Sequence, residues 1–103
     1  MGQVINVDAV AGADPQTRTF FLDRGLTGQG LRAFTSPEEA SGDRPEERLA
    51  RNLFDTAGVV SVFFYESSIV VSKTASASWD EIIPRCVDAI RNLFIYYDVN
   101  LVR

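Results

Sequence analysis

Two runs rich in β-branched and aromatic residues dominate the second half of the chain, at 59–65 and 69–73. Both have the composition of β-strands. Only Glu66-Ser67-Ser68 separates them, so an antiparallel hairpin is the simplest connection. Residues 59–65 are apolar on both faces, which favours a strand inside a sheet over one at its edge.

Three earlier segments also have strand character, at 3–10, 17–22 and 31–35. Asp14-Pro15-Gln16 separates the first two and is typical of a turn, because proline pre-sets φ and aspartate can accept a hydrogen bond from the backbone that follows. A glycine-containing stretch separates the second from the third. These segments bring the number of expected strands to about five.

Helix-start signals precede two helices in the middle of the chain. At 36–39 the pattern Ser-Pro-Glu-Glu predicts a single turn that stops by Gly42. At 43–46 the pattern Asp-Arg-Pro-Glu predicts the start of a longer helix that Gly58 ends. The apolar stripe of this helix is expected to comprise Leu49, Leu53 and Ala57, beside Ala50 and Phe54.

A third capping pattern, Ser78-Trp79-Asp80-Glu81, predicts the last helix. Apolar residues then recur at helical spacing as far as Tyr97, and the tail at 99–103 is expected to form a short strand or to fray. The element order predicts an α+β fold, with a mixed or antiparallel sheet of about five strands and two helices packed on one face. We expect residues 1–103 to form a single domain.

No histidine occurs among the 103 residues. Ser-His-Asp and Cys-His nucleophilic sites, and metal sites with imidazole ligands, are therefore excluded. A net charge of −4, with Lys and Arg interspersed among Asp and Glu, disfavours binding to nucleic acids and anionic membranes. No signal peptide and no bilayer-spanning segment is recognisable. We expect a cytoplasmic protein.

Cys86 is the obvious candidate for a reactive group, since it is the one cysteine. Its position among the apolar residues of the last helix predicts a buried small hydrophobe instead. A reactive thiol needs an electropositive and partly exposed setting. The glycines at 25, 28 and 30 precede a strand, not a helix, and predict a turn instead of a phosphate-binding loop.

Charged residues on the last helix form no evident acid–base pair. Glu81 and Arg85 are four residues apart and predict a solvated ion pair. We therefore expect no enzyme activity and no bound cofactor. An enzyme that uses only arginines and carboxylates is the less favoured alternative, and a polar-lined cleft would revive it.

The remaining candidate is a surface for protein contacts. Residues near the C-terminus include two tyrosines, a residue type that is enriched at interfaces, although packing against the core is the favoured explanation for them. The candidate contact residues are Tyr96, Tyr97, Val99 and Leu101.

Residues 13–94 resemble the N-terminal domain of the Nfu (NifU-like) iron–sulfur scaffold family, and 95–103 form a tail to that match. The order and spacing of several short stretches carry the resemblance. They are Pro15-Gln16-Thr17 with Phe20, 34–40, Leu53-Phe54, 58–64, 69–73 and 79–84.

The resemblance implies an accessory role in iron–sulfur cluster assembly or delivery, through contacts with assembly factors or apo-proteins. In that family the Cys-x-x-Cys that binds the cluster lies in a separate domain, so no cluster ligand can be transferred to this sequence. A four-iron cluster normally needs four thiolates, whereas this chain offers one. Two alternatives remain: a protein-binding or self-association module unrelated to iron–sulfur chemistry, and a cluster bridged by Cys86 between subunits.

Overall fold

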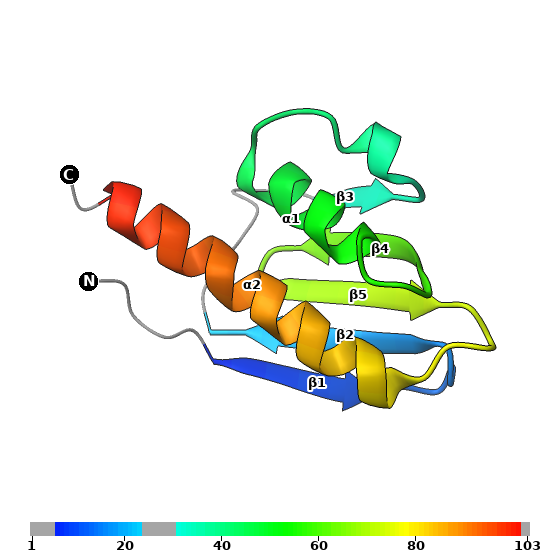
Figure 1. The fold of residues 1–103 in the computed structure, drawn as a ribbon. Coiled ribbons are helices and arrows are strands. Elements are labelled where there is room, and N and C mark those ends of the chain that lie inside the picture. The colour runs from blue at the N-terminus through cyan, green and yellow to red at the C-terminus, as the bar shows by residue number, and fades with distance from the viewer. Residues whose placement is uncertain (1–5, 24–30, 102–103) are drawn as a thin grey trace.

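The computed structural model describes residues 6–23 and 31–101 (Figure 1), with side chains described as far as Phe94. The elements in chain order are β1 Val7–Ala11, β2 Thr17–Leu22, β3 Leu31–Phe34, the 3₁₀ turn η1 Pro37–Glu39, α1 Pro45–Phe54, β4 Val59–Tyr65, β5 Ser68–Lys73 and α2 Trp79–Leu101.

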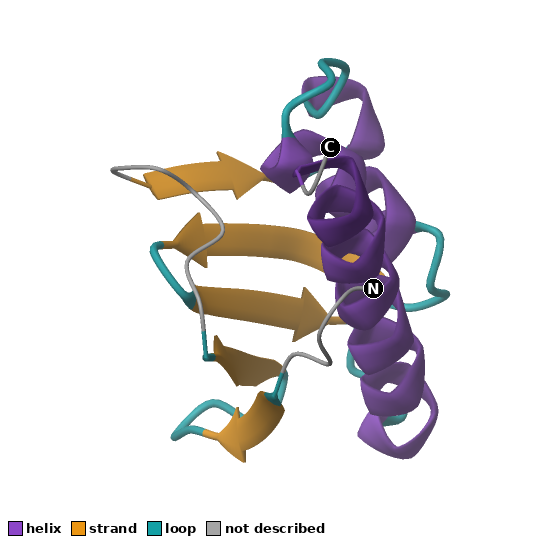
Figure 2. Ribbon diagram, turned by 90° about the vertical axis from the view of Figure 1, so that its left-hand side faces the viewer, coloured by secondary structure: helices purple, strands orange, loops and turns teal. Residues whose placement is uncertain are grey.

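The five strands form one sheet in the order β1-β2-β5-β4-β3, and every neighbouring pair is antiparallel. Figure 2 shows α1 and α2 on the same face of this sheet. The predicted α+β class is confirmed, with an antiparallel rather than a mixed sheet. Residues 59–65 form an interior strand as predicted, because β4 lies between β5 and β3.

Alternation along the strands directs one set of side chains into the core beneath the helices. Phe20, Phe64 and Ile69 are fully buried there, and they lie side by side on β2, β4 and β5. Phe34 and Phe64 meet edge to face, with ring centroids 5.9 Å apart. From the helices, the buried apolar side chains are Leu49, Ala50 and Leu53 of α1 and Trp79, Ile82, Cys86, Ile90, Leu93 and Phe94 of α2.

The first helix ends earlier than its sequence suggests. α1 stops at Phe54, and the following turn buries Thr56 and exposes Ala57, so the prediction that Ala57 continues the apolar stripe is wrong. Gly58 is not the residue that ends the helix. It has φ +99° in the turn into β4, and a Cβ there would lie 2.5 Å from the Cβ of Ala77.

The last helix extends further than expected. α2 continues to Leu101, so the alternative of a short strand at the C-terminus is wrong for 99–101. At its start Ser78 Oγ accepts a hydrogen bond from the Asp80 amide at 3.2 Å, which is the predicted N-cap contact. No helix within the described ranges is long and apolar enough to cross a membrane.

Candidate interaction site

Cys86 lies on the core face of α2, one turn from both Ile82 and Ile90. Its side chain is 0% exposed, and burial raises the pKa of the thiol to about 12. A thiolate is the form that binds iron or attacks an electrophile, and this thiol stays protonated at neutral pH. The predicted core position is confirmed. The burial argues against a cluster bridged by Cys86 between subunits.

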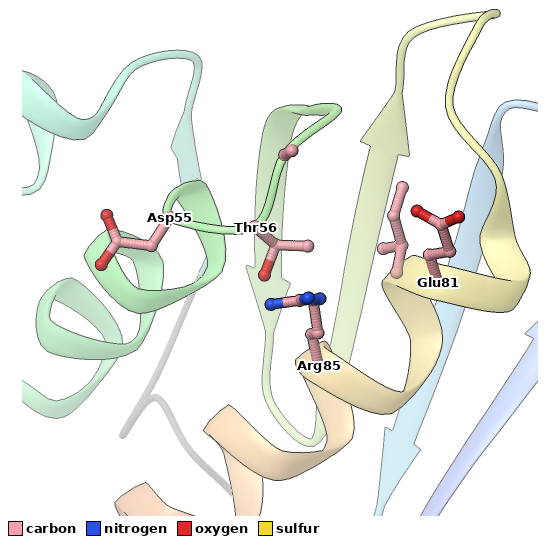
Figure 3. Close-up of a pocket in the computed structure, with 6 residues that line it drawn as sticks. Asp55, Thr56, Glu81 and Arg85 are labelled. Atoms are coloured by element: carbon pink, nitrogen blue, oxygen red, sulfur yellow. The ribbon is translucent and has the colours of Figure 1, made fainter.

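A groove lies between the end of α1 and the start of α2 (Figure 3). It consists of two adjoining hollows of about 190 and 330 Å³, which share Ala57, Glu81 and Ile82 as walls. The smaller is completed by Asp55, Thr56 and Arg85. The larger is completed by Gly58, Thr74, Ser76, Ala77 and Ser78.

The predicted ion pair between Glu81 and Arg85 does not form, although the structure describes both residues. Figure 3 shows Arg85 extended toward Thr56, at the end of α1, while Glu81 lies further toward the start of α2. The carbonyl end of a helix carries partial negative charge, which favours a cation at this position. The exposed guanidinium therefore faces the groove and can donate hydrogen bonds to a bound partner.

The shape of the groove depends on Gly58, which lies in the turn after α1 and contacts the segment before α2. With no side chain at this position, Ala77 of the segment before α2 can pack directly against the backbone. The groove is open and shallow, with hydroxyls, carboxylates and one guanidinium along it. Such a surface suits a turn or a polar side chain of another protein better than an enclosed small substrate.

Trp79 fixes the start of α2 next to the groove. Its Nε1 donates a 2.8 Å hydrogen bond to the carbonyl oxygen of Pro15 in the β1–β2 turn. Two cationic groups flank the ring, Arg18 Cζ at 5.4 Å and Lys73 Nζ at 5.8 Å from its centroid. Sequence reasoning treated Trp79 only as part of a capping pattern, because its partners lie far away in the chain.

A charge network fixes the start of α1 against β3. Glu46 is buried, and its Oε2 accepts hydrogen bonds from Arg32 Nη1 at 2.8 Å and from Arg44 Nε at 2.9 Å. Arg32 Nη2 also donates to Glu47 at 3.0 Å, and this bond is the main cause that lowers the pKa of the Glu47 carboxyl. Sequence reasoning missed this network, because it joins Arg32 to a residue 14 positions away in the chain.

Several sequence predictions fall outside what the structure describes. The side chains of Tyr96, Tyr97, Val99 and Leu101 are among them, although the backbone of all four belongs to α2. The glycine turn at 25–30 also lies outside the described residues. Within the described ranges, no three His, Cys, Asp or Glu side chains are placed to hold a metal ion.

Comparison with known proteins identifies the family. The profile described as "Scaffold protein Nfu/NifU N terminal" matches residues 7–95, slightly more than the resemblance at 13–94. A search of curated proteins found no significant match.

Solved structures share the fold at low sequence identity. The NifU-like protein from Saccharomyces cerevisiae superposes with a TM-score of 0.72 at 17% identity, over 86% of this chain and 77% of that one. The crystal structure of protein SAV1430 from Staphylococcus aureus gives 0.68 at 18% identity, over 85% and 99% of the two chains. The fold and the profile therefore agree: the chain belongs to the Nfu/NifU N-terminal scaffold family, and this membership implies a role in iron–sulfur cluster biology.

Proposed function

We propose that this domain assists iron–sulfur cluster assembly or delivery by binding other proteins, without ligating the cluster itself. Its partners are assembly factors or the apo-proteins that receive clusters. In this role the domain positions a cluster carrier that supplies the thiolates, and it performs no chemical step.

The burial of Cys86 carries the proposal. Cluster binding needs several accessible thiolates. The one cysteine of this chain is closed off in the core with its proton retained, and the sequence has no histidine. Exposing Cys86 would require pulling α2 off the sheet, which would disrupt the core that Ile82 and Ile90 share with it.

The groove at the helix ends is the proposed contact region. Arg85 has its guanidinium exposed beside Thr56, and the hydroxyls of Ser76 and Ser78 line the continuation. A partner that places a carboxylate against Arg85 would make a charge-assisted hydrogen bond without displacing any core residue. Tyr96, Tyr97, Val99 and Leu101 stay candidate contacts as predicted from the sequence.

Affinity capture from native lysate tests the role. The immobilised chain should enrich cluster-assembly factors or iron–sulfur apo-enzymes, as quantified by mass spectrometry. Arg85→Glu should reduce this enrichment, whereas Arg91→Glu, an equal charge change at an exposed site on the same helix outside the groove, should retain it. Recovery of neither class of protein would contradict the proposal.

Anaerobic reconstitution with iron and sulfide tests the absence of ligation. We expect well below one iron per chain, for the wild type and for Cys86→Ser alike, because one buried thiol cannot replace four ligands. Stoichiometric iron that disappears in Cys86→Ser would refute the proposal.

A further inference from the structure

The face of the sheet opposite the helices carries two mainly apolar rows of outward side chains, beside a third, polar row formed by Thr17, Ser72 and Ser61. The register places Val10, Thr19, Val70, Phe63 and Ala33 in one row across β1, β2, β5, β4 and β3. The second row, in the same strand order, consists of Asp8, Phe21, Ser68, Tyr65 and Leu31. Figure 2 shows that neither α1 nor α2 covers this face.

These rows are unusually apolar for a surface in contact with water. Phe21 and Tyr65 are each 46% exposed and Leu31 is 56% exposed. Antiparallel sheets with one solvated face normally carry polar side chains there. Among the ten residues of the two rows Asp8, on the edge strand β1, is the one charged side chain. Depletion of charge together with exposed aromatic residues is typical of the centre of a protein interface.

We propose that two copies of this chain associate through this face, about a two-fold axis that runs parallel to the strands between β4 and β5. Such an axis keeps each row opposite the same row of the second copy. The sheets then pack in the aligned manner, about 10 Å apart. The interface is isologous, so every contact occurs twice.

Over β4 and β5 this position of the axis matches large side chains with small ones, and at the flanks it sets Leu31 of each copy over Phe21 of the other. Because neighbouring strands are evenly spaced, it places Tyr65 of each copy over Ser68 of the other and Phe63 over Val70. Ala33 lies over Thr19 in the same way. An axis over β5 itself would instead set Tyr65 against Phe21, two bulky rings, so we reject that arrangement.

The arrangement of charge favours the same axis. With the axis between β4 and β5, the strand β1 of each copy projects beyond β3 of the other, so Asp8 stays in water. An axis over β5 would place both Asp8 carboxylates against Leu31 and remove them from solvent at a cost. The interface thus contains no charged side chain, and the net charge of −4 on each copy lies outside it, where salt screens it.

The available area sets the strength of the association. With roughly 200 Å² for a whole aromatic side chain, the exposed parts of Phe21 and Tyr65 in two copies amount to about 370 Å². The rest of the two rows adds to this. A total at or below about 1,200 Å² belongs to the weak, reversible class of interfaces. We therefore expect a dimer that forms between about 10 μM and 1 mM.

Sedimentation equilibrium over this concentration range tests the proposal on the chain itself. The wild type should pass from monomer to dimer, and Tyr65→Lys should weaken dimerisation at least about tenfold, because it places an ammonium group over Ser68. Asn52→Lys adds the same charge at an exposed position of α1 and should leave the equilibrium unchanged. Circular dichroism checks that each variant is folded, and Leu31→Lys replaces Tyr65→Lys if it is not.

Amide chemical shifts recorded during dilution locate the surface. They should change along β2, β5, β4 and β3 and stay constant at Asp8 on β1. A wild type that is monomeric up to 1 mM would overturn the proposal, and so would a dimer that tolerates Tyr65→Lys and Leu31→Lys. These outcomes are separate from those of lysate capture and iron binding, so the two proposals can fail independently.

Discussion

Replacing Glu46 with glutamine removes the negative charge at the centre of the network between β3 and α1. Glu46 is 1% exposed, and its carboxylate accepts hydrogen bonds from two guanidinium groups, those of Arg32 and Arg44. Glutamine has nearly the same size, so no cavity forms. The change therefore isolates the electrostatic contribution of the carboxylate from its packing.

The expected loss follows from these two bonds. A hydrogen bond to a charged group contributes about 1 kcal/mol more than a neutral one, so the two together give about 2 kcal/mol. Breaking a fully buried ion pair costs about 3–5 kcal/mol. The smaller value applies here because both guanidinium groups are partly exposed and water can solvate them once they lose their partner.

Urea denaturation followed by circular dichroism measures the loss. With an m-value of about 1–2 kcal/mol/M, the midpoint of Glu46→Gln should fall by roughly 1–2 M. Glu38→Gln, at an exposed site on η1, should change the free energy of unfolding by less than about 0.5 kcal/mol. If Glu46→Gln unfolds at the wild-type midpoint, the negative charge of Glu46 contributes nothing to holding β3 and α1 together.

Three further substitutions probe other parts of the fold. The free energy of unfolding of the wild type should exceed that of Cys86→Ala by a constant amount up to pH 9. Between pH 9 and pH 12 this difference should fall by about 1.4 kcal/mol per pH unit, because in that range only the unfolded wild type releases the thiol proton. Gly58→Ala should cost about 2–3 kcal/mol in urea denaturation, because φ +99° and the contact with Ala77 both oppose a methyl group, whereas Gly12→Ala, in open space, should be neutral. Trp79→Phe should lower the melting temperature by about 4–12 °C through loss of the hydrogen bond to Pro15, and an unchanged value would show that this bond contributes nothing.

Local patterns in the sequence were sufficient for most of the elements. The strand at 17–22 and the start of the helix at 45 agree with the structure because β-branched runs and proline after a polar residue act within a few positions. The core position of Cys86 followed from helical spacing for the same reason. The end of α1 was misplaced because tertiary packing buries Thr56 in a turn where the apolar periodicity favoured Ala57.

The features that define the candidate surfaces depend on strand order, which local periodicity does not encode. Arg32 meets Glu46 only because β3 lies at the edge of the sheet beside α1. The apolar character of β4 on both faces predicted its interior position correctly. The apolar residues on the second face of β4 are Phe63 and Tyr65, which lie on the side of the sheet that the helices do not cover.

The position of β5 at the centre of the sheet has a consequence for how the protein is made. Thr17 on β2 pairs with Ser72 on β5, 55 residues later in the chain. A ribosome therefore completes the β1–β2 hairpin well before its neighbour exists. At about 5–20 residues per second, β2 waits roughly 3–11 s for β5 to pair with it, and longer for α2 to cover Phe20 and Leu22. During that interval the side chains of Phe20 and Leu22, which the folded chain buries, stay exposed on the nascent hairpin.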